Sequence, residues 1–282
     1  MTKWEPDKII EILINAAKTA FEYYDIAEKE IKDDLSIVTA ADKQIEFELA
    51  SIFENLRDGS YVIGEESLNL KEKSYLKSAL ENTVWIVDPI DGTVQYANGL
   101  PFWGISIGFA VNGVIQEGAV YFPVFKEMFI TCGDDVFTAK IDTFSDKNPS
   151  LLNFKKLLKT SSCYNEYDIV VLTQKFAKNG IIDIPNPVLV LCCATASFCF
   201  TGSGKFMAYV GANIKLWDYA ASFAILNKLG FHAVFINGEQ MSTEIKKNHL
   251  FNNGDMLMPI KGEVVVASEI DIVERLRKKI IN

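Results

Sequence analysis

The most informative stretch of the sequence is WIVDPIDGT, residues 85–93, where an apolar run ends abruptly in two aspartates, a proline and a glycine. Asp88 and Asp91 lie three positions apart, and Pro89 bends the chain between them. Two carboxylates at the end of a buried strand repel each other unless a cation neutralises them, and the Ile90 carbonyl adds an oxygen of the kind that Mg²⁺ prefers. The pattern is that of a metal site, although an acidic turn that closes a strand is the commoner explanation of one such motif alone.

Gly92 and Thr93 follow the second aspartate and offer backbone N–H groups. If a helix begins here, its N-terminus is suited to bind a phosphate group. One short segment could therefore place a cation next to an anionic ligand.

Two further acidic segments stand at comparable positions. Glu65 and Glu66 come directly after the strand-like run that ends at residue 63, and Asp218 opens an alanine-rich helical segment in LWDYAAS, residues 216–222. Taken separately, the glutamates are explained by a solvated loop, and Asp218 by the preference of acids for a helix N-terminus.

The elements that must position these acids can be read from the periodicity of apolar residues. Two amphipathic helices are expected first, over residues 6–28 and 40–56, with Pro6 in the first turn of one and Thr39 as N-cap of the other. Asp42, three residues after Thr39, fits a capping box. Asn112-Gly113 predicts a tight hairpin. The strands expected in this half are residues 61–63, 84–87, 105–111, 114–121 and 128–131.

A polar stretch over residues 140–167 indicates a boundary between two lobes. We expect an N-terminal α+β lobe, residues 1–140, that carries most of the metal site, and a C-terminal α/β lobe, residues 141–282, that contributes Asp218 and the substrate wall. The active site would lie between them. In the second lobe, strands are expected at 169–172, 188–191, 234–236 and 264–267, and helices at 196–206, 219–229 and 270–281.

The composition narrows the possible functions. The chain has 282 residues, is 49% hydrophobic and carries a formal net charge of -9, so it should fold throughout and repel nucleic acid and anionic membranes. A phosphate ligand would then have to be recruited by a cation held on clustered acids. The chain has 2 histidines, which argues against a structural zinc site and against a histidine-based triad.

The compartment is also suggested by the sequence. The 5 cysteines are odd in number and lack metal-type spacing, which favours buried thiols in a reducing cytoplasm. The first residues do not resemble a secretory signal, and no apolar run is long enough to span a membrane. We expect a cytoplasmic protein without a membrane or nucleic-acid partner.

Taken together, the motifs GEES, WIVDPIDGT and LWDYAAS resemble those of the inositol monophosphatase family, the lithium-sensitive, magnesium-dependent phosphatases. The resemblance runs over nearly the whole chain, to VVVAS at residues 264–268. It implies the layered αβαβα sandwich (α/β, or α+β) of this family of sugar phosphatases, and a homodimer. It also implies a phosphoric monoester hydrolase that releases inorganic phosphate from a small polyol or sugar phosphate by means of a metal-activated water.

The resemblance assigns roles to individual residues. Asp88 would be shared between two Mg²⁺ ions, a third and weaker ion would bind near Glu65, and Mn²⁺ could replace Mg²⁺. Thr93 would pair with Asp42 to orient the attacking water. The implied metal ligands are Glu65, Asp88, the Ile90 carbonyl, Asp91 and Asp218. The implied catalytic residues are Glu65, Asp42 and Thr93, and the implied substrate contacts are Asp91, Gly92, Thr93, Ala194 and Asp218.

The sequence departs from the family pattern on the substrate side. The inositol enzymes typically have a glutamate seven residues before the aspartate of the W-D motif, where this chain has Gly211. The usual Gly-Ser/Thr-Ala segment is Cys192-Cys193-Ala194 here. The frequent asparagine and histidine after D-G-T are replaced by Gln95 and Asn98. Without the glutamate, we expect weak discrimination among polyol phosphates, or room for a bulkier alcohol.

Three functions therefore stay open at this point. The first is a phosphatase for inositol or another small polyol or sugar phosphate. The second is a 3′(2′),5′-bisphosphate nucleotidase or an NADP phosphatase. The third is a regulatory protein that uses the same fold to bind a partner, as some bacterial relatives are thought to do with the transcription machinery. It ranks lowest, because every metal-ligating acid is present and the chain is acidic.

Overall fold

The computed structural model describes residues 1–282 except 25–27, 33–36, 147, 180, 253–254 and 282. The α-helices are α1 (Pro6–Tyr24), α2 (Ala40–Phe53), α3 (Lys73–Leu80), α4 (Thr93–Tyr96), α5 (Gln174–Asn179), α6 (Ala194–Gly202), α7 (Leu216–Lys228), α8 (Ile245–Asn248) and α9 (Ile270–Arg277). Short 3₁₀ turns cover Leu56–Asp58, Leu68–Leu70 and Leu151–Asn153.

The first nine strands are β1 (Glu30–Ile31), β2 (Ile37–Val38), β3 (Ser60–Gly64), β4 (Thr83–Asp91), β5 (Gly104–Val111), β6 (Val114–Phe122), β7 (Glu127–Cys132), β8 (Asp135–Lys140) and β9 (Lys155–Leu157). The others are β10 (Val170–Leu172), β11 (Ile181–Ile182), β12 (Val188–Leu189), β13 (Ala208–Gly211), β14 (His232–Phe235), β15 (His249–Asn252), β16 (Asp255–Ile260), β17 (Val264–Ala267) and β18 (Ile280–Ile281).

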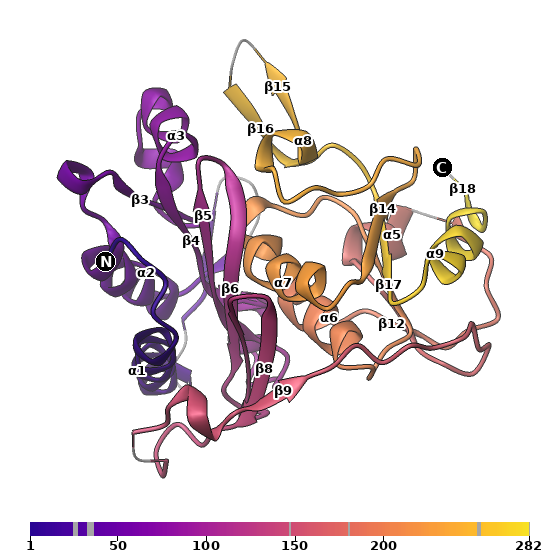
Figure 1. Ribbon diagram of the computed structural model, residues 1–282, viewed down its shortest axis with the longest axis horizontal. Coiled ribbons are helices and arrows are strands. Elements are labelled where there is room, and N and C mark those ends of the chain that lie inside the picture. The colour runs from indigo at the N-terminus through magenta and orange to yellow at the C-terminus, as the bar shows by residue number, and fades with distance from the viewer. Residues whose placement is uncertain (25–27, 33–36, 147, 180, 253–254, 282) are drawn as a thin grey trace.

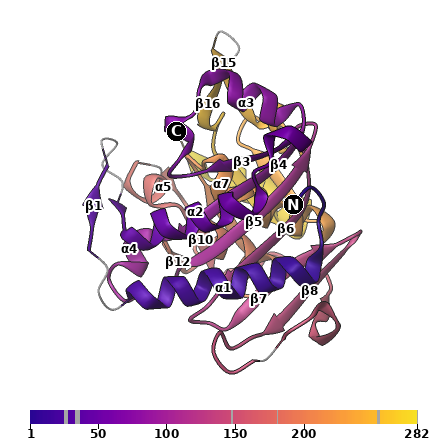
Figure 2. The ribbon, with the colours of Figure 1, turned by 90° about the vertical axis from the view of Figure 1, so that its left-hand side faces the viewer.

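These elements form the layered αβαβα sandwich that the sequence predicted. In Figure 1, helices α1 and α2 lie at the left against a large sheet, α6 and α7 lie between that sheet and a second one, and α9 covers the outside. Figure 2 shows α1 and α2 running across the face of the large sheet. The helix pair α6 and α7 is therefore packed between two sheets, which explains why nearly every α7 residue is buried.

The large sheet has the strand order β3-β4-β5-β6-β7-β8-β9. Strands β3 and β4 are parallel and the others pair antiparallel. The hairpin predicted from Asn112-Gly113 joins β5 to β6, and both residues have positive φ, 51° and 73°, as a type I′ turn requires. Strand β9 still pairs with β8, so the sheet extends beyond residue 140, and the division into two lobes at that residue stays a prediction.

The first two helices follow the predicted pattern. Helix α1 begins at Pro6 and buries one face, which includes Ile10, Leu13 and Ala17; the end of the predicted segment falls partly on residues 25–27, outside the described residues. Thr39 caps α2 in the predicted capping box with Asp42, and α2 ends at residue 53, three residues earlier than expected.

The second sheet has the order β12-β10-β13-β17-β14 and mixes parallel and antiparallel pairs. Its central strand β13, which is 4 residues long, was not among the strands predicted from the sequence. Helix α7 begins at Leu216, three residues before the predicted start, and this makes Asp218 its third residue. None of the described helices is long and apolar enough to cross a membrane.

The expectation of buried cysteines is only partly correct. Cys193 and Cys199 are buried, Cys132 and Cys192 are partly exposed, and Cys163 is exposed. All five are free thiols.

Close contact between α7 and the large sheet depends on glycine. A β-carbon on Gly118 of β6 would overlap the backbone carbonyl of Ala221, and one on Gly108 of β5 would lie 2.9 Å from the Ala220 Cβ. Glycine therefore lets the helix that carries Asp218 lie directly on the sheet that carries Asp88.

Because the obstacle at Gly118 is backbone, we predict that Gly118→Ala lowers the free energy of unfolding by about 2 kcal/mol or more, a typical cost of overpacking. Urea denaturation followed by circular dichroism measures it. Gly262→Ala is the control, since the nearest atom to its added β-carbon is 4.0 Å away. A Gly118→Ala variant as stable as that control would contradict the tight packing described here.

Candidate active site

The centre of the candidate site is the carboxylate of Asp88 at the carboxyl end of β4. Asp88 is 1% exposed, and neither of its Oδ atoms has a hydrogen-bond partner among the described residues. Burial raises the pKa of Asp88 well above its ordinary value, and the nearby Glu65, Asp91 and Asp218 raise it further. A buried charge without a partner is costly, so this position calls for a cation or a proton.

Asp91 connects the large sheet to α6. Its Oδ1 accepts the N–H of Ala194 at 3.2 Å, and its Oδ2 accepts the N–H and the hydroxyl of Thr195 at 2.5 and 2.6 Å. The Cys193 thiol donates to the same Oδ2 at 3.2 Å. Asp91 thus caps the start of α6, where unpaired N–H groups favour an anion. The sequence did not indicate this role for Thr195 or Cys193, since both are far from Asp91 along the chain.

Asp218 reaches the site from α7. Its Oδ2 accepts the backbone N–H of Lys215 at 2.8 Å, which fixes the carboxylate at the helix N-terminus. Burial raises the pKa of Asp218 well above its ordinary value, and the negative charges of Asp91 and Glu65 raise it further. The structure therefore brings together the carboxylates of two separate layers, as the sequence motifs predicted.

Glu65 and Glu66 follow β3, and both pair with Lys32. The Lys32 Nζ lies 3.0 Å from Glu65 Oε1 and 2.6 Å from Glu66 Oε1. Burial raises the pKa of Glu66 to about 7, against the opposing effect of the lysine. Lys32 was missed in the sequence analysis because no local pattern connects it with residues more than 30 positions away. An ammonium group thus occupies the acidic edge of the site in this structure.

Glu46 of α2 holds the turn that carries Glu65. Its carboxylate accepts the N–H groups of Glu66 and Ser67, each at 2.8 Å, and is 3% exposed. It packs so closely against Gly64 that any β-carbon there would overlap it. The glycine of GEES is thereby explained by contact with a buried carboxylate that sequence analysis did not identify.

Asp42 makes the two contacts expected of it, with Thr39 and with Thr93. Its Oδ2 accepts the Thr39 N–H at 2.8 Å in the capping box, and its Oδ1 accepts the Thr93 hydroxyl at 3.3 Å. That hydroxyl also lies 3.0 Å from the Ile90 carbonyl oxygen. Burial raises the pKa of Asp42 to about 6, so this carboxylate can exchange a proton near neutral pH.

Gly92 separates Asp91 from the single-turn helix α4. It has φ of 89°, a conformation that strongly favours glycine, and an added β-carbon would lie 2.5 Å from the Phe102 carbonyl oxygen. The predicted helix start at Thr93 is confirmed.

A cavity of about 150 Å³ opens beside these acids. Asp91, Cys193, Ala194 and Asp218 contribute to its wall. The remaining lining residues are Leu172, Thr173, Gln174, Cys192, Ser197, Tyr209, Ala212, Asn213 and Ile214.

The residues around Gly211 change one expectation. A β-carbon on Gly211 would overlap the Ile214 Cδ1 and lie 3.1 Å from the Tyr209 ring. The space beside the glycine is therefore occupied, so the expected extra room for a bulkier alcohol is not found there. Cys192 has φ of 53°, a left-handed conformation that favours glycine, in keeping with the glycine that the family usually has at that position.

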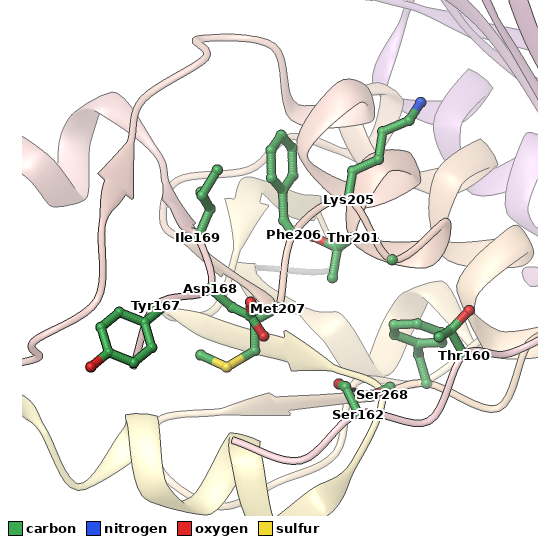
Figure 3. Close-up of a pocket in the computed structure, with 12 residues that line it drawn as sticks. Thr160, Ser162, Tyr167, Asp168, Ile169, Thr201, Lys205, Phe206, Met207 and Ser268 are labelled. Carbon is green, nitrogen blue, oxygen red and sulfur yellow. Dashed lines mark hydrogen bonds between the residues drawn. The ribbon is translucent and has the colours of Figure 1, made fainter. Parts of the chain in front are cut away.

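A second cavity, of about 220 Å³, is lined by a different set of residues (Figure 3). Its wall includes Thr160, Asp168 and Ser268 and shares no residue with the cavity beside Asp218. Figure 3 shows the Lys205 side chain directed away from the other labelled residues, and its ammonium pairs with Glu127 at 2.5 Å. Of the site residues predicted from the sequence, Asp91, Ala194 and Asp218 line the acidic cavity, and none lines this second one.

The donor set at the acidic cavity fits a hard divalent cation. The groups around Asp88 are carboxylates and a backbone carbonyl, the oxygen ligands that Mg²⁺ prefers. Within the described residues, however, no group of three Asp, Glu, His or Cys side chains stands ready to hold an ion. The unpartnered charge of Asp88, rather than a preformed ligand cage, is what supports a metal here.

A layered α/β sandwich with an acidic cavity between its layers defines the class of fold, and comparison with known proteins identifies the family. The model of the inositol monophosphatase family matches residues 6–278. Human inositol monophosphatase 1 is 28% identical over 237 residues, which cover 82% of this chain and 83% of the human protein. The Nus factor SuhB of Pasteurella multocida is 24% identical over 237 residues, with 82% and 86% covered.

Solved structures agree on the fold. The Thermotoga maritima IMPase superimposes with a TM-score of 0.71 at 19% identity and covers 96% of each chain. The chain belongs to the inositol monophosphatase family, as the motifs predicted. Membership makes the protein a phosphatase.

The raised pKa values predict how stability depends on pH. The pKa of Asp42 is about 6 instead of 3.8, and that of Glu66 about 7 instead of 4.5, so both bind protons more tightly when folded. This contribution to stability is full below pH of about 4 and is lost as pH rises through about 7. Metal-free protein should therefore become less stable between these pH values, as thermal unfolding with a chelator will show.

The cost of burying the Asp88 carboxylate can be measured with the Asp88→Asn variant. The amide is less costly to bury than the unpartnered carboxylate, so the metal-free variant at pH of about 7.5 should unfold at least about 2–4 °C higher than wild type, or about 1 kcal/mol. Asp134→Asn, at an exposed position, controls for net charge. Equal unfolding temperatures for wild type and Asp88→Asn would show that Asp88 is neutralised within the protein.

Proposed function

We propose that this protein is a Mg²⁺-dependent phosphate monoester hydrolase that releases inorganic phosphate from a small polyol or sugar phosphate. The observation that carries the proposal is the buried, unpartnered carboxylate of Asp88, with Glu65, Asp91 and Asp218 around it. Such a group of like charges lowers stability, and a bound divalent cation would both neutralise it and attract a phosphate. Family membership supplies independent support.

Each acid has a part in this proposal. Glu65, Asp88, the Ile90 carbonyl, Asp91 and Asp218 would hold two or three ions, and Mn²⁺ would substitute for Mg²⁺. When bound, the metal supplies charge neutralisation of the phosphate and a lowered pKa for water. Gly92, Thr93 and Ala194 would contact the substrate. We place the ions between the N-terminal lobe, residues 1–140, and the lobe of residues 141–282.

Thr93 and Asp42 would prepare the attacking water. The Thr93 hydroxyl has its proton directed to the Ile90 carbonyl or to Asp42, which leaves its oxygen lone pairs to accept a hydrogen bond from water. Because the pKa of Asp42 is about 6, its carboxylate is a suitable acceptor for a proton released near neutral pH. This arrangement would orient the water and remove its proton through two contacting side chains, one from α2 and one from α4.

The cavity also bears on the choice of ester. In the described part of the chain, no lysine or arginine lines it, whereas Asp91 and Asp218 do. A second phosphate on the alcohol would meet like charge without a cation to pair with, which favours a monophosphate over a 3′(2′),5′-bisphosphate nucleotide or NADP. A homodimer acting on a free metabolite, which the family resemblance implies, belongs to the same proposal. So do a cytoplasmic location, favoured by the cysteine content, and the lack of a nucleic-acid or membrane partner, favoured by the net charge of -9.

Asp88→Asn should reduce turnover to less than about a tenth of wild type at saturating Mg²⁺, a barrier increase above about 1.4 kcal/mol, because the amide cannot serve two ions. Phosphate release is measured on inositol 1-phosphate, glycerol 2-phosphate, fructose 1,6-bisphosphate, an adenosine bisphosphate and NADP, with Asp134→Asn as control. Retained turnover in Asp88→Asn would refute the metal role. If the wild-type enzyme hydrolyses only the nucleotides, the proposed substrate class is wrong and a nucleotide phosphatase takes its place. If it releases no phosphate from any of these esters, a regulatory protein is favoured.

Metal dependence can be tested on the wild-type enzyme alone. Chelation should abolish phosphate release, Mg²⁺ or Mn²⁺ should restore it, and Li⁺ should inhibit, as expected for a site of hard oxygen ligands. Hydrolysis at full rate in excess chelator would exclude the metal mechanism. Insensitivity to Li⁺ alone would leave the metal mechanism intact and weaken only the analogy with the family.

A further inference from the structure

Tyr209 is a second polar group at the site that the protein leaves unpaired. The residue is fully buried, and its hydroxyl has no hydrogen-bond partner among the described residues. Other buried tyrosines differ: the Tyr121 hydroxyl lies 2.8 Å from the Ile141 carbonyl oxygen, and the Tyr96 hydroxyl donates to the Ala20 carbonyl at 2.6 Å. An unmet hydroxyl in a protein interior costs free energy, so a binding partner is a natural reason for its presence.

The position of this hydroxyl is informative. Tyr209 lines the acidic cavity together with Asp91, Cys193 and Asp218, and the same three groups influence its hydroxyl electrostatically. Its ring lies edge to face against Phe198, with centroids 4.8 Å apart, which holds the ring in place. The hydroxyl is therefore fixed beside the carboxylates where phosphate chemistry is proposed.

Tyr209 also stands next to Gly211 on β13. Residues two apart on a strand share a face, and the Tyr209 ring lies 3.1 Å from the position of a β-carbon on Gly211. The glutamate expected at position 211 is absent, and Ile214 adds an apolar contact there. Among the residues around Gly211, Tyr209 is thus the one that provides a polar atom.

We propose that the Tyr209 hydroxyl determines specificity by donating a hydrogen bond to a hydroxyl oxygen of the leaving alcohol, on a carbon adjacent to the ester carbon. This inference rests on the proposed function. A phenol donates to a neutral oxygen without introducing another negative charge beside Asp91 and Asp218, as a glutamate would. The site then selects esters of polyols over esters of simple alcohols by one neutral hydrogen bond.

The test compares glycerol 2-phosphate with isopropyl phosphate, which has the same carbon skeleton without the two hydroxyls. Tyr209→Phe should lower kcat/KM for the glycerol ester by about three- to tenfold, as expected for a neutral hydrogen bond, and leave that for isopropyl phosphate within about 1.5-fold. Isothermal titration calorimetry with Ca²⁺ in place of Mg²⁺ should show that Tyr209→Phe raises the Kd of the glycerol ester and leaves the Kd of isopropyl phosphate unchanged.

A matched variant and a stability measurement exclude a structural effect. Tyr121→Phe removes a paired hydroxyl elsewhere and should lower the unfolding temperature without changing the preference between the two esters. Tyr209→Phe should unfold at the same temperature as wild type or higher, since it loses no hydrogen bond to any of the described residues.

Several outcomes would overturn the inference. They are an equal loss on both esters, no loss on either, a wild type that binds neither ester, or a marked destabilisation of Tyr209→Phe. Wild type that binds the glycerol ester through Tyr209 but does not hydrolyse it with Mg²⁺ would instead refute the proposed function alone.

Discussion

Electrostatic repulsion among buried carboxylates at the end of β4 is the constraint around which the rest of the structure is arranged. Two of these acids are stabilised by the backbone: Asp91 by the first N–H groups of α6 and Asp218 by that of Lys215. Glu65 is neutralised by Lys32. Among these four acids, Asp88 alone has no hydrogen-bond partner in the described chain. Asp88 is therefore the position at which a bound ion would be needed most.

The layers of the fold explain how distant segments meet at this point. Strand β4 belongs to the large sheet, and α6 and α7 lie between the two sheets (Figure 1). Glycine at positions 108 and 118 allows α7 to contact the sheet directly, and the Asp91 cap fixes α6. The acids are thus held on regular elements packed on both sides, an arrangement that keeps like charges in place against their repulsion.

Much of this could be predicted from the sequence, because the acids of WIVDPIDGT, GEES and LWDYAAS follow strands or begin helices with clear periodicity. The contributions of Lys32, Glu46 and Tyr209 could not. Lys32 and Glu46 act on residues distant in sequence, so no local spacing reveals them. Tyr209 lies on β13, which was not predicted from the sequence, and its unpaired hydroxyl depends on the packing of distant segments. The filled space beside Gly211 was equally hidden, since it depends on how Ile214 packs.

The Lys32 ion pairs change how metal binding should be understood. Because the single Lys32 ammonium already offsets part of the negative charge of Glu65 and Glu66, an arriving ion would enter a site that contains its own counterion, and binding would be an exchange of one cation for another. The free energy of such an exchange is the difference between the attraction of the acids for the metal ion and their attraction for the Lys32 ammonium. At the proposed metal site, the acids of the metal-free protein would thus keep part of their neutralisation, and a given metal occupancy would need a higher metal concentration than at a site without Lys32.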